Sequence, residues 1–589
     1  MHACSTHRQP KRYTVWWGPD PSQVRFAVLR SFSAHLAGCV FWLGLLNCSH
    51  LLAQQSEDYL RELQFRAVDS QQANWMHWGD RVGKFSNWTN HSNRLIPVYS
   101  FGLTLESVKG PHSVYRDADA IRHLYGCLPD ETLNPQAEYF DQTDIYRLQK
   151  QALDGKKQNI ILMIFDGMDW QTTQAAAIYK NHRIVYTKGR GTGLSFLDYA
   201  GATSDFGFCV TAPGYCNVQE DVDTQSVTDQ GGPHHTGGYA PDFGGATPWS
   251  PPGDPSYLVG KRRNLHHRVT DSAASATSMT SGIKTYNAAI GVTSTGQQVE
   301  TIAHEAQRIG KAIGIVTNVP ISHATPGSAY AHNVSRNDYQ DIARDLLGLK
   351  SVSHPDQPLP GVDVLLGGGW GEMKADDRSK QGRNYVPGNC YLTDQDLAQV
   401  NFDNGGRYIV AQRTAGKPGA DVLRQGVHQA IDRRARLLGF FGAQNGHLPF
   451  QTADGKFDPT RGVTRTDHYA PEEILENPTL ADLTAAALEV LDQRESGFWL
   501  MVEAGDVDWA NHNNNLDDAI GAVLSGEAAF DVITNWVEKH SSWDETVLIV
   551  TSDHGHMLNI DNLDVLTGRP IELDSKSSAG ESGPQDFGK

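Results

Sequence analysis

The chain has 589 residues, more than one typical hydrophobic core contains, so one large elaborated domain and two domains are both compatible with it. Its formal net charge of −18 argues against a nucleic-acid partner, because a phosphate backbone requires a basic surface. Small phosphorylated substrates are not excluded, since metal ions can supply positive charge locally. The 24 histidines and the 68 aspartates and glutamates are ample ligands for such ions.

Residues 1–53 have the pattern of an export signal or an N-terminal anchor. Basic residues precede an apolar run at residues 36–46, which is too short for a comfortable membrane span and fits a signal h-region. Ala53 is an acceptable cleavage residue. The sequence Leu-Ala-Gly-Cys at residues 36–39 resembles a lipobox, so a lipid anchor is the alternative. We therefore expect a periplasmic or secreted protein with one catalytic domain over residues 54–589.

The cysteine count agrees with export. Four cysteines follow the signal, namely Cys127, Cys209, Cys216 and Cys390. An even number is compatible with two disulfides in an oxidising compartment. Cys209 and Cys216 flank a turn-rich segment that favours their pairing, and a Cys127–Cys390 pair follows only by default.

Three short, continuously apolar segments predict buried parallel strands of an α/β fold. They are residues 159–165, 498–502 and 547–550. Helical patterns lie between the strands, for example at residues 480–491 and 520–537. Residues 201–267 are rich in Gly, Pro and Asp, and residues 372–470 are polar with few strand signals, so both are expected to be loop insertions on the rim of the sheet.

Each predicted strand ends in acidic or metal-binding residues. Asp166 follows the first strand, Glu503 the second, and Asp553 with His554 the third. In open α/β sheets ligands bind at the carboxyl ends of the strands. We therefore expect these side chains to converge on one site.

The run Arg-Val-Thr-Asp-Ser-Ala-Ala-Ser-Ala-Thr at residues 268–277 places Ser272 where a helix would begin. Unpaired N–H groups and the positive end of the helix dipole suit a nucleophile that attacks an anionic ester. An ordinary helix cap by Asp271 is the alternative for such a sequence on its own. The acidic strand ends elsewhere in the chain favour the nucleophile.

Together, these segments resemble the alkaline phosphatase family over residues 159–560. The matching segments are residues 159–168, 269–292, 316–336, 362–369, 498–512 and 547–556. The resemblance implies a central, mostly parallel sheet between helices, usually in a homodimer. It implies hydrolysis of small phosphate monoesters through a phosphoserine formed on Ser272.

The resemblance also implies two zinc ions, which in such sites clamp the attacking and leaving oxygens from roughly 4 Å apart. One zinc would take Asp166, Asp553, His554 and the Ser272 oxygen, and the other would take Asp508 and His512. Asp508 and His512 are four residues apart, so one helical turn would direct both to the same face. Mixed histidine and carboxylate ligation suits zinc.

A third metal and a phosphate clamp complete the site that the resemblance implies. Asp166, Thr325 and Glu503 match the family's magnesium ligands, which are hard oxygen donors. His323 replaces the aspartate of enterobacterial members, so Zn²⁺ or Co²⁺ is the alternative third ion. Arg336 matches the residue whose planar fork binds two phosphate oxygens.

One ligand is displaced along the chain. The family's second zinc takes a further histidine some forty residues beyond the Asp-His pair, whereas no histidine follows His556 here. His91, followed by a short apolar strand, reads like that segment, and residues 75–126 read like the family's C-terminal end. We interpret this as a circular permutation in which His91 completes the zinc site and His556 hydrogen-bonds Asp508.

Two alternative functions remain open. A phosphodiesterase or sulfatase of the same superfamily shares the metal-binding strands, although the Ser272 run and Arg336 favour monoesters. A non-catalytic surface protein that binds metal or phosphate would require a lost nucleophile or ligand. Turnover of a chromogenic phosphate with and without a chelator separates the enzymes from the binding protein.

Overall fold

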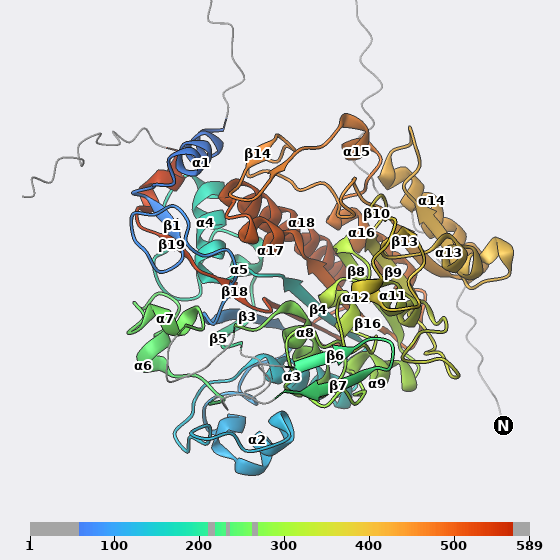
Figure 1. Ribbon diagram of the computed structural model, residues 1–589, viewed down its shortest axis with the longest axis horizontal. Helices are drawn as coiled ribbons and strands as arrows, with labels where there is room; N and C mark the ends of the chain where they lie inside the picture. Colours follow the sequence, from blue (N-terminus) through green and yellow to red (C-terminus); the bar gives the residue numbers. More distant parts are fainter. Residues whose placement is uncertain (1–57, 210–217, 231–235, 262–268, 569–589) are drawn as a thin grey trace, which may run out of the picture. The chain divides into compact units, whose positions relative to one another are not determined.

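A computed structural model describes residues 58–209, 218–230, 236–261 and 269–568 of the chain. Their central feature is a nine-stranded sheet (Figure 1). In spatial order its strands are β12 (Tyr408–Gln412), β13 (Arg436–Phe440), β9 (Val364–Gly368), β8 (Ala312–Pro320), β16 (Phe498–Ala504), β4 (Asn159–Phe165), β17 (Thr546–Thr551), β3 (Ile96–Phe101) and β5 (Thr203–Gly207).

The sheet is mostly parallel, as the sequence predicted. All neighbours from β12 to β17 pair in parallel, whereas β3 and β5 add an antiparallel edge beside β17. Every residue of β4 is buried, which is why its sequence is apolar without alternation. Ile161, Met163 and Phe165 pack into one core layer, and the residues between them pack into the other.

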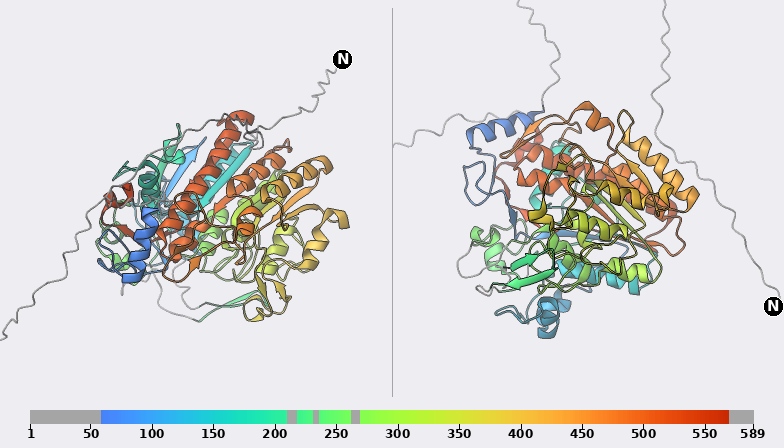
Figure 2. Two further views of the ribbon diagram at one scale, coloured as in Figure 1. Left: turned by 90° about the horizontal axis from the view of Figure 1, so that it is seen from above. Right: turned by 45° about the vertical axis from the view of Figure 1, so that its right-hand side comes forward.

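Helices cover both faces of this sheet (Figures 1 and 2). One face packs against α4 (Trp170–Asn181), α14 (Gly419–Arg433), α16 (Leu480–Leu491) and α18 (Leu516–His540). The other packs against α3 (Gln142–Asp154), α8 (Ser272–Ser281), α9 (Ile302–Arg308) and α11 (Tyr339–Leu347). The predicted helices at residues 480–491 and 520–537 are confirmed by α16 and α18.

The remaining elements are short and lie around the sheet. The helices are α1 (Tyr59–Ser70), α2 (Ala118–Tyr125), α5 (Ser195–Asp198), α6 (Pro241–Gly244), α7 (Pro255–Leu258), α10 (Ala324–Ser328), α12 (Arg378–Gln381), α13 (Asp394–Val400), α15 (Pro471–Leu475) and α17 (Asp506–His512). The paired strands are β1 (Met76–Trp78) with β19 (Leu558–Ile560), β2 (His91–Ser92) with β18 (Gly555–His556), β6 (Val218–Asp221) with β7 (Ser226–Asp229), β10 (Met373–Lys374) with β11 (Gly388–Asn389), and β14 (Thr460–Arg461) with β15 (Thr466–Asp467).

Both predicted loop insertions contain parts of the main sheet. Residues 372–470 include β12, α14 and β13, a parallel unit at the sheet edge, so the expectation of rim loops is wrong there. Residues 201–267 include β5, which forms the opposite edge. Edge strands are short and partly exposed, so their sequences lack the long apolar run by which β4 was recognised.

Neither of the two predicted cysteine pairs is formed in this structure. Cys127 and Cys390 are unpaired thiols, one exposed and one buried, so the pairing by default is wrong. Cys209 is likewise a free, buried thiol, so the predicted Cys209–Cys216 pair is also wrong. Cys216 itself and residues 1–53 lie outside the described residues, so the signal stays a prediction. Within the described ranges, no helix combines the length and apolar character needed to cross a membrane.

Candidate functional site

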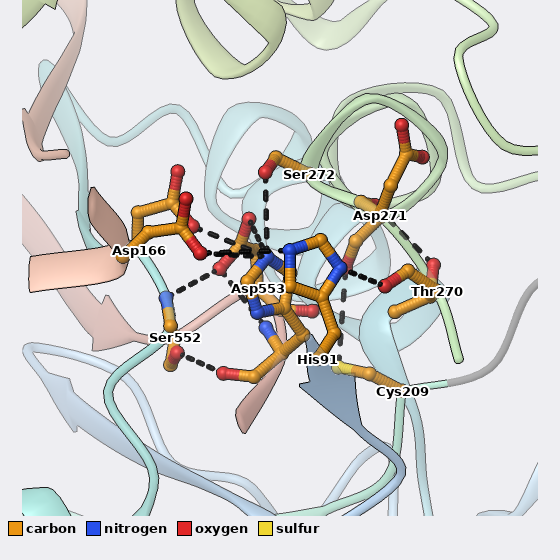
Figure 3. A network of polar contacts seen from close by, with 12 residues as sticks. His91, Asp166, Cys209, Thr270, Asp271, Ser272, Ser552 and Asp553 are labelled. Atoms are coloured by element: carbon orange, nitrogen blue, oxygen red, sulfur yellow. Dashed lines mark hydrogen bonds and ion pairs between the residues drawn. The ribbon is translucent and has the colours of Figure 1, made fainter. Parts of the chain in front are cut away.

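Ser272 is the first residue of α8, as the sequence predicted. Asp271 caps this helix, since its Oδ1 accepts a hydrogen bond from the Ala274 N–H at 2.9 Å. The helix is built from small residues and is buried between α3 and α10, so its N-terminus is held rigidly. The Ser272 hydroxyl lies 3.3 Å from Nε2 of His554, and Figure 3 shows it directed toward the cluster that contains Asp166.

Arg336 lies beside this helix start. Its Nη1 donates to Oδ2 of Asp271 at 3.0 Å, and its backbone N–H donates to the Ala288 carbonyl at 2.7 Å. The same Asp271 oxygen accepts the Ala288 N–H at 2.9 Å. The capping carboxylate therefore also positions the guanidinium beside Ser272.

His91 and His512 each present a bare nitrogen to Asp508. Nδ1 of His91 donates to the Thr270 carbonyl at 2.8 Å, and Nδ1 of His512 donates to the Thr89 carbonyl at 2.6 Å. A carbonyl only accepts, so each neutral ring carries its proton on Nδ1 and a lone pair on Nε2. The two Nε2 atoms are 2.9 Å apart, and they lie 3.5 Å and 3.3 Å from Oδ1 of Asp508.

These spacings fit one metal ion. Ligand atoms about 2.0–2.1 Å from a tetrahedral zinc lie roughly 3.3 Å from each other. Without a cation, two lone pairs and a carboxylate oxygen would face each other, with His91 and Asp508 buried and His512 partly exposed. The helical turn of α17 brings Asp508 and His512 together, as predicted, and β2 supplies His91 from far along the chain.

His556 also contacts the Asp508 carboxylate, and its ring centre lies 4.9 Å from that of His512. Its Nε2 lies 2.8 Å from Oδ1 of Asp508, a hydrogen-bond distance. Burial opposes ionisation of Asp508, but His512, His556 and His91 outweigh it and hold its pKa well below the ordinary value. This agrees with the predicted role of His556 as a partner that orients the carboxylate.

The backbone turn at Gly167 leaves room for the His556 ring. Gly167 has φ +72°, and a Cβ there would lie 2.8 Å from Nε2 of His556. An alanine at positive φ costs about 1 kcal/mol in backbone strain. We expect Gly167→Ala to lower the thermal midpoint of unfolding further than this strain alone would, because the new Cβ would also contact His556. Gly83→Ala is the matched control, because Gly83 has φ +82° with no atom within 4 Å of such a Cβ. Equal midpoints for the two variants would show that the His556 contact is unimportant.

A second group of ligand atoms surrounds His554. Its Nε2 lies 3.2 Å from Oδ1 of Asp166 and 3.4 Å from Oδ2 of Asp553, as well as 3.3 Å from the Ser272 hydroxyl. Oδ1 of Asp553 accepts the Gly167 N–H at 3.0 Å, which leaves Oδ2 directed at the cluster. These spacings again match the edges of a tetrahedral zinc site.

The cluster concentrates negative charge away from water. Burial raises the pKa of Asp166 well above its ordinary value, and the carboxylates of Asp553, Asp508 and Glu503 raise it further. Burial also raises the pKa of Glu503 to about 7 and that of Asp553 to about 6. Like charges in a buried site favour protonation, and a divalent cation reverses that preference.

Glu503 and Thr325 supply oxygens beside Asp166. Oε2 of Glu503 accepts a hydrogen bond from Thr317 Oγ1 at 2.5 Å. Several buried oxygens of the described residues have no hydrogen-bond partner: both carboxylate oxygens of Asp166, Oδ2 of Asp553, Oε1 of Glu503 and Oγ1 of Thr325. Such atoms are costly to bury without a partner. Their donor set fits zinc at the histidine-containing positions and magnesium at the all-oxygen position.

His323 lies in the same pocket but is engaged elsewhere. Its Nε2 is 3.3 Å from Nη2 of Arg336, which can only donate. Burial and the charge of Arg336 lower the pKa of His323 to about 3. In this orientation Nε2 of His323 accepts from the guanidinium, so in the neutral ring the buried, unpartnered Nδ1 carries the proton and offers no lone pair to a third metal.

The entrance to the site includes a residue that the sequence analysis missed. Arg465, from the segment predicted to be a loop insertion, lines a pocket of about 290 Å³ together with Ser272, Arg336 and Trp509. Its guanidinium lies 5.5 Å from the Trp509 ring centre. Only the fold brings it there, because its surroundings in the sequence carry no recognisable motif.

The chain is similar to known alkaline phosphatases. The family model for alkaline phosphatase matches residues 255–582. Alkaline phosphatase 4 of Bacillus subtilis is 30% identical over 306 residues, which is 51% of this chain and 50% of the relative. The alkaline phosphatase of Escherichia coli is 29% identical over 329 residues, 52% of this chain and 62% of the relative.

Solved structures of similar proteins include the alkaline phosphatases of Thermus thermophilus and of the Antarctic bacterium TAB5. Each is 21% identical with a TM-score of 0.40, covering 68% of this chain and 60% and 80% of the respective relative. The chain spans about half to three fifths of the curated relatives named above. Since the family model matches more than half of its 589 residues, the chain belongs to the alkaline phosphatase family.

Proposed function

We propose that this protein hydrolyses phosphate monoesters through a phosphoserine intermediate on Ser272. The observation that carries the proposal is the position of the Ser272 hydroxyl at the start of α8. It lies 3.3 Å from His554 within a cluster of buried carboxylates and histidines, and it shares a pocket with Arg336. Phosphate monoesters are dianions, and this combination would neutralise their charge before attack.

Two zinc ions would occupy the histidine-containing positions. One would take Asp166, Asp553 and His554, and the other would take Asp508, His512 and His91. When bound, these ions would supply Lewis acidity and would lower the pKa of oxygens at the reacting phosphorus. Asp166, Thr325 and Glu503 suit Mg²⁺, and Zn²⁺ or Co²⁺ requires that His323 turn away from Arg336.

Arg336, the N-terminus of α8 and Ser272 would have different roles in the reaction. Arg336 would hold two oxygens of the phosphoryl group, and the N-terminus of α8 would add positive potential. The Ser272 oxygen would form a bond to phosphorus as the bond to the substrate alcohol breaks. Water would then hydrolyse the phosphoserine, which releases inorganic phosphate and restores the serine. Because binding is directed at the phosphoryl group, we expect broad tolerance of the alcohol.

We also propose that residues 75–126 represent the family's C-terminal segment in a circularly permuted chain. Two observations support this. β3 lies in the main sheet beside β17, and His91 lies beside the Asp508 cluster. Residues 75–126 would then be an integral part of the catalytic domain at residues 54–589.

Export to the periplasm or the medium, with a signal or anchor at residues 1–53, and a homodimeric assembly complete the proposal. They rest on the sequence pattern and on the resemblance to the family. Secretion of full-length protein, and size-exclusion chromatography with light scattering, test these two points separately.

The test of the function is turnover of nitrophenyl phosphate and of its bis-ester at alkaline pH, before and after chelation and after zinc is restored. We expect rapid monoester turnover that chelation abolishes and zinc restores. Faster diester turnover would favour the phosphodiesterase alternative. Absence of turnover in zinc-loaded protein would contradict an enzymatic role.

We expect Arg336→Ala to weaken binding of inorganic phosphate while metal content stays unchanged. Loss of a buried, bidentate charge partner costs roughly 2–5 kcal/mol, and the Asp271 carboxylate would also lose its ion pair. The inhibition constant for phosphate reports the change. Arg336→Lys keeps the charge without the planar fork, so its affinity for phosphate should fall between those of wild type and Arg336→Ala. Unaltered phosphate inhibition in Arg336→Ala would contradict the role of clamp.

A further inference from the structure

A separate histidine group lies outside the candidate active site. His332 belongs to the segment that leads from α10 to Arg336, and His354 belongs to the loop that follows α11. Nδ1 of His332 and Nε2 of His354 are 3.3 Å apart. His332 is buried and the His354 side chain is 11% exposed, so this contact lies just beneath the surface.

The other nitrogen of each ring is bound to an acceptor. Nε2 of His332 lies 2.8 Å from the Val299 carbonyl oxygen, and Nδ1 of His354 lies 2.9 Å from Oδ1 of Asp345. Both oxygens accept, so each ring places a proton on that side. In the neutral rings, the two nitrogens that face each other at 3.3 Å are therefore both lone pairs.

Two facing lone pairs repel unless a proton or a cation lies between them. A proton would make one ring cationic. The separation of 3.3 Å is also the distance expected between two ligands of a tetrahedral metal ion, roughly 3.3 Å.

The surroundings hold both rings in this arrangement. Asp345 accepts the Ser351 hydroxyl and the His354 ring at Oδ1, and it accepts the His332 backbone N–H at Oδ2, 3.0 Å away. A carboxylate or carbonyl behind a histidine is the usual device that orients metal-binding rings. His304 stacks on His332, but its Nδ1 accepts the Thr301 N–H at 3.1 Å, so its other nitrogen carries the proton and offers no lone pair.

We propose that Nδ1 of His332 and Nε2 of His354 bind a divalent transition-metal ion such as Zn²⁺ or Co²⁺, with Asp345 orienting His354 and water completing the coordination. Imidazole nitrogens are preferred by these ions over Mg²⁺ or Ca²⁺. The site is distinct from the candidate active site and does not depend on the proposed function.

The ion would join the two ends of a loop that contains α11. Cross-linking residues 332 and 354 reduces the freedom of the intervening chain in the unfolded state. It would also hold the segment before Arg336, whose Asn333 exchanges both backbone hydrogen bonds with Ile290. The role of this ion is therefore structural, and its removal should lower stability.

The experiment counts metal ions in full-length protein. Wild type and His354→Asn are stripped with a chelator, dialysed against the same Zn²⁺ concentration and measured by mass spectrometry of metals. We expect the variant to bind one zinc fewer per chain. Added Zn²⁺ should also raise the thermal midpoint of the stripped wild type more than that of the variant. Loading with Co²⁺ should give visible absorption bands that the variant partly loses.

His182→Asn is the matched control, because His182 is an exposed histidine at the end of α4. It should keep the wild-type zinc count. His354→Gln provides a second variant in case the asparagine disturbs the loop. Equal zinc counts and equal zinc-dependent midpoints in wild type and in folded His354 variants would overturn the proposal and would leave a proton between the rings. This outcome does not depend on phosphatase activity, so it is distinguishable from failure of the proposed function.

Discussion

Ser272→Ala is expected to reduce phosphate monoester turnover by at least about 10³-fold, the scale seen when a nucleophile is removed from a hydrolase. The reason is geometric, since the Ser272 hydroxyl lies 3.3 Å from Nε2 of the His554 ring. The variant should also lose the covalent phosphoenzyme that acid quenching traps in wild type. Radiolabelled phosphate retained on denatured protein measures this intermediate.

Metal content separates this loss from general damage to the site. Ser272 contributes one oxygen to a cluster otherwise built from Asp166, Asp553 and His554, so zinc should stay bound in Ser272→Ala. Ser281→Ala is the control, because Ser281 lies at the opposite end of α8 and only bonds the Thr277 carbonyl. If Ser272→Ala trapped phosphate as well as wild type does, another residue would be the nucleophile.

The parts of this fold that the sequence predicted are those with strong local patterns. The buried run at residues 159–165 became β4 with the same bounds, and residues 480–491 became α16. The period of a helix was enough to predict that Asp508 and His512 share one face, and the capping residue Asp271 was enough to place Ser272 at a helix start. In each case the information lies within a dozen neighbouring residues.

The parts of the fold and of the site that the sequence did not predict depend on contacts between segments far apart in the chain. β12 is a five-residue edge strand, and α14 carries Asp, Gln, His and Arg on its exposed side, so residues 372–470 appeared to be loop. Arg465 reaches the pocket only because β14 and β15 form a hairpin near α17. The facing nitrogens of His332 and His354 depend on the backbone carbonyl of Val299, which no sequence pattern reveals.

His91 was predicted in part. Its role as a zinc ligand was predicted from the resemblance to the family, whereas its position in the site could be seen only in the folded structure. β2 pairs with β18 so that His91 is opposite His556, which places the ring beside Asp508. The Thr270 carbonyl then fixes the tautomer that directs Nε2 into the cluster. The segment that bears the nucleophile thus also orients this histidine.

His91→Ala is expected to lose about one zinc per active site and nearly all turnover, with partial recovery at high zinc concentration. Removing a partner that merely orients a ligand costs 10–100-fold in metal affinity, so removing a ligand itself should cost at least about that much. Metal analysis after gel filtration measures the zinc, and a zinc titration of the turnover rate measures the recovery.

His123→Ala is the matched control, since His123 is an exposed histidine of α2 in the same amino-terminal segment. It should keep both zinc ions and the wild-type rate. The contrast matters because, of these two histidines, His91 lies beside Asp508 whereas His123 is exposed on α2. A His91→Ala enzyme with full zinc and full rate would therefore exclude the permutation and the catalytic role of the amino-terminal segment together.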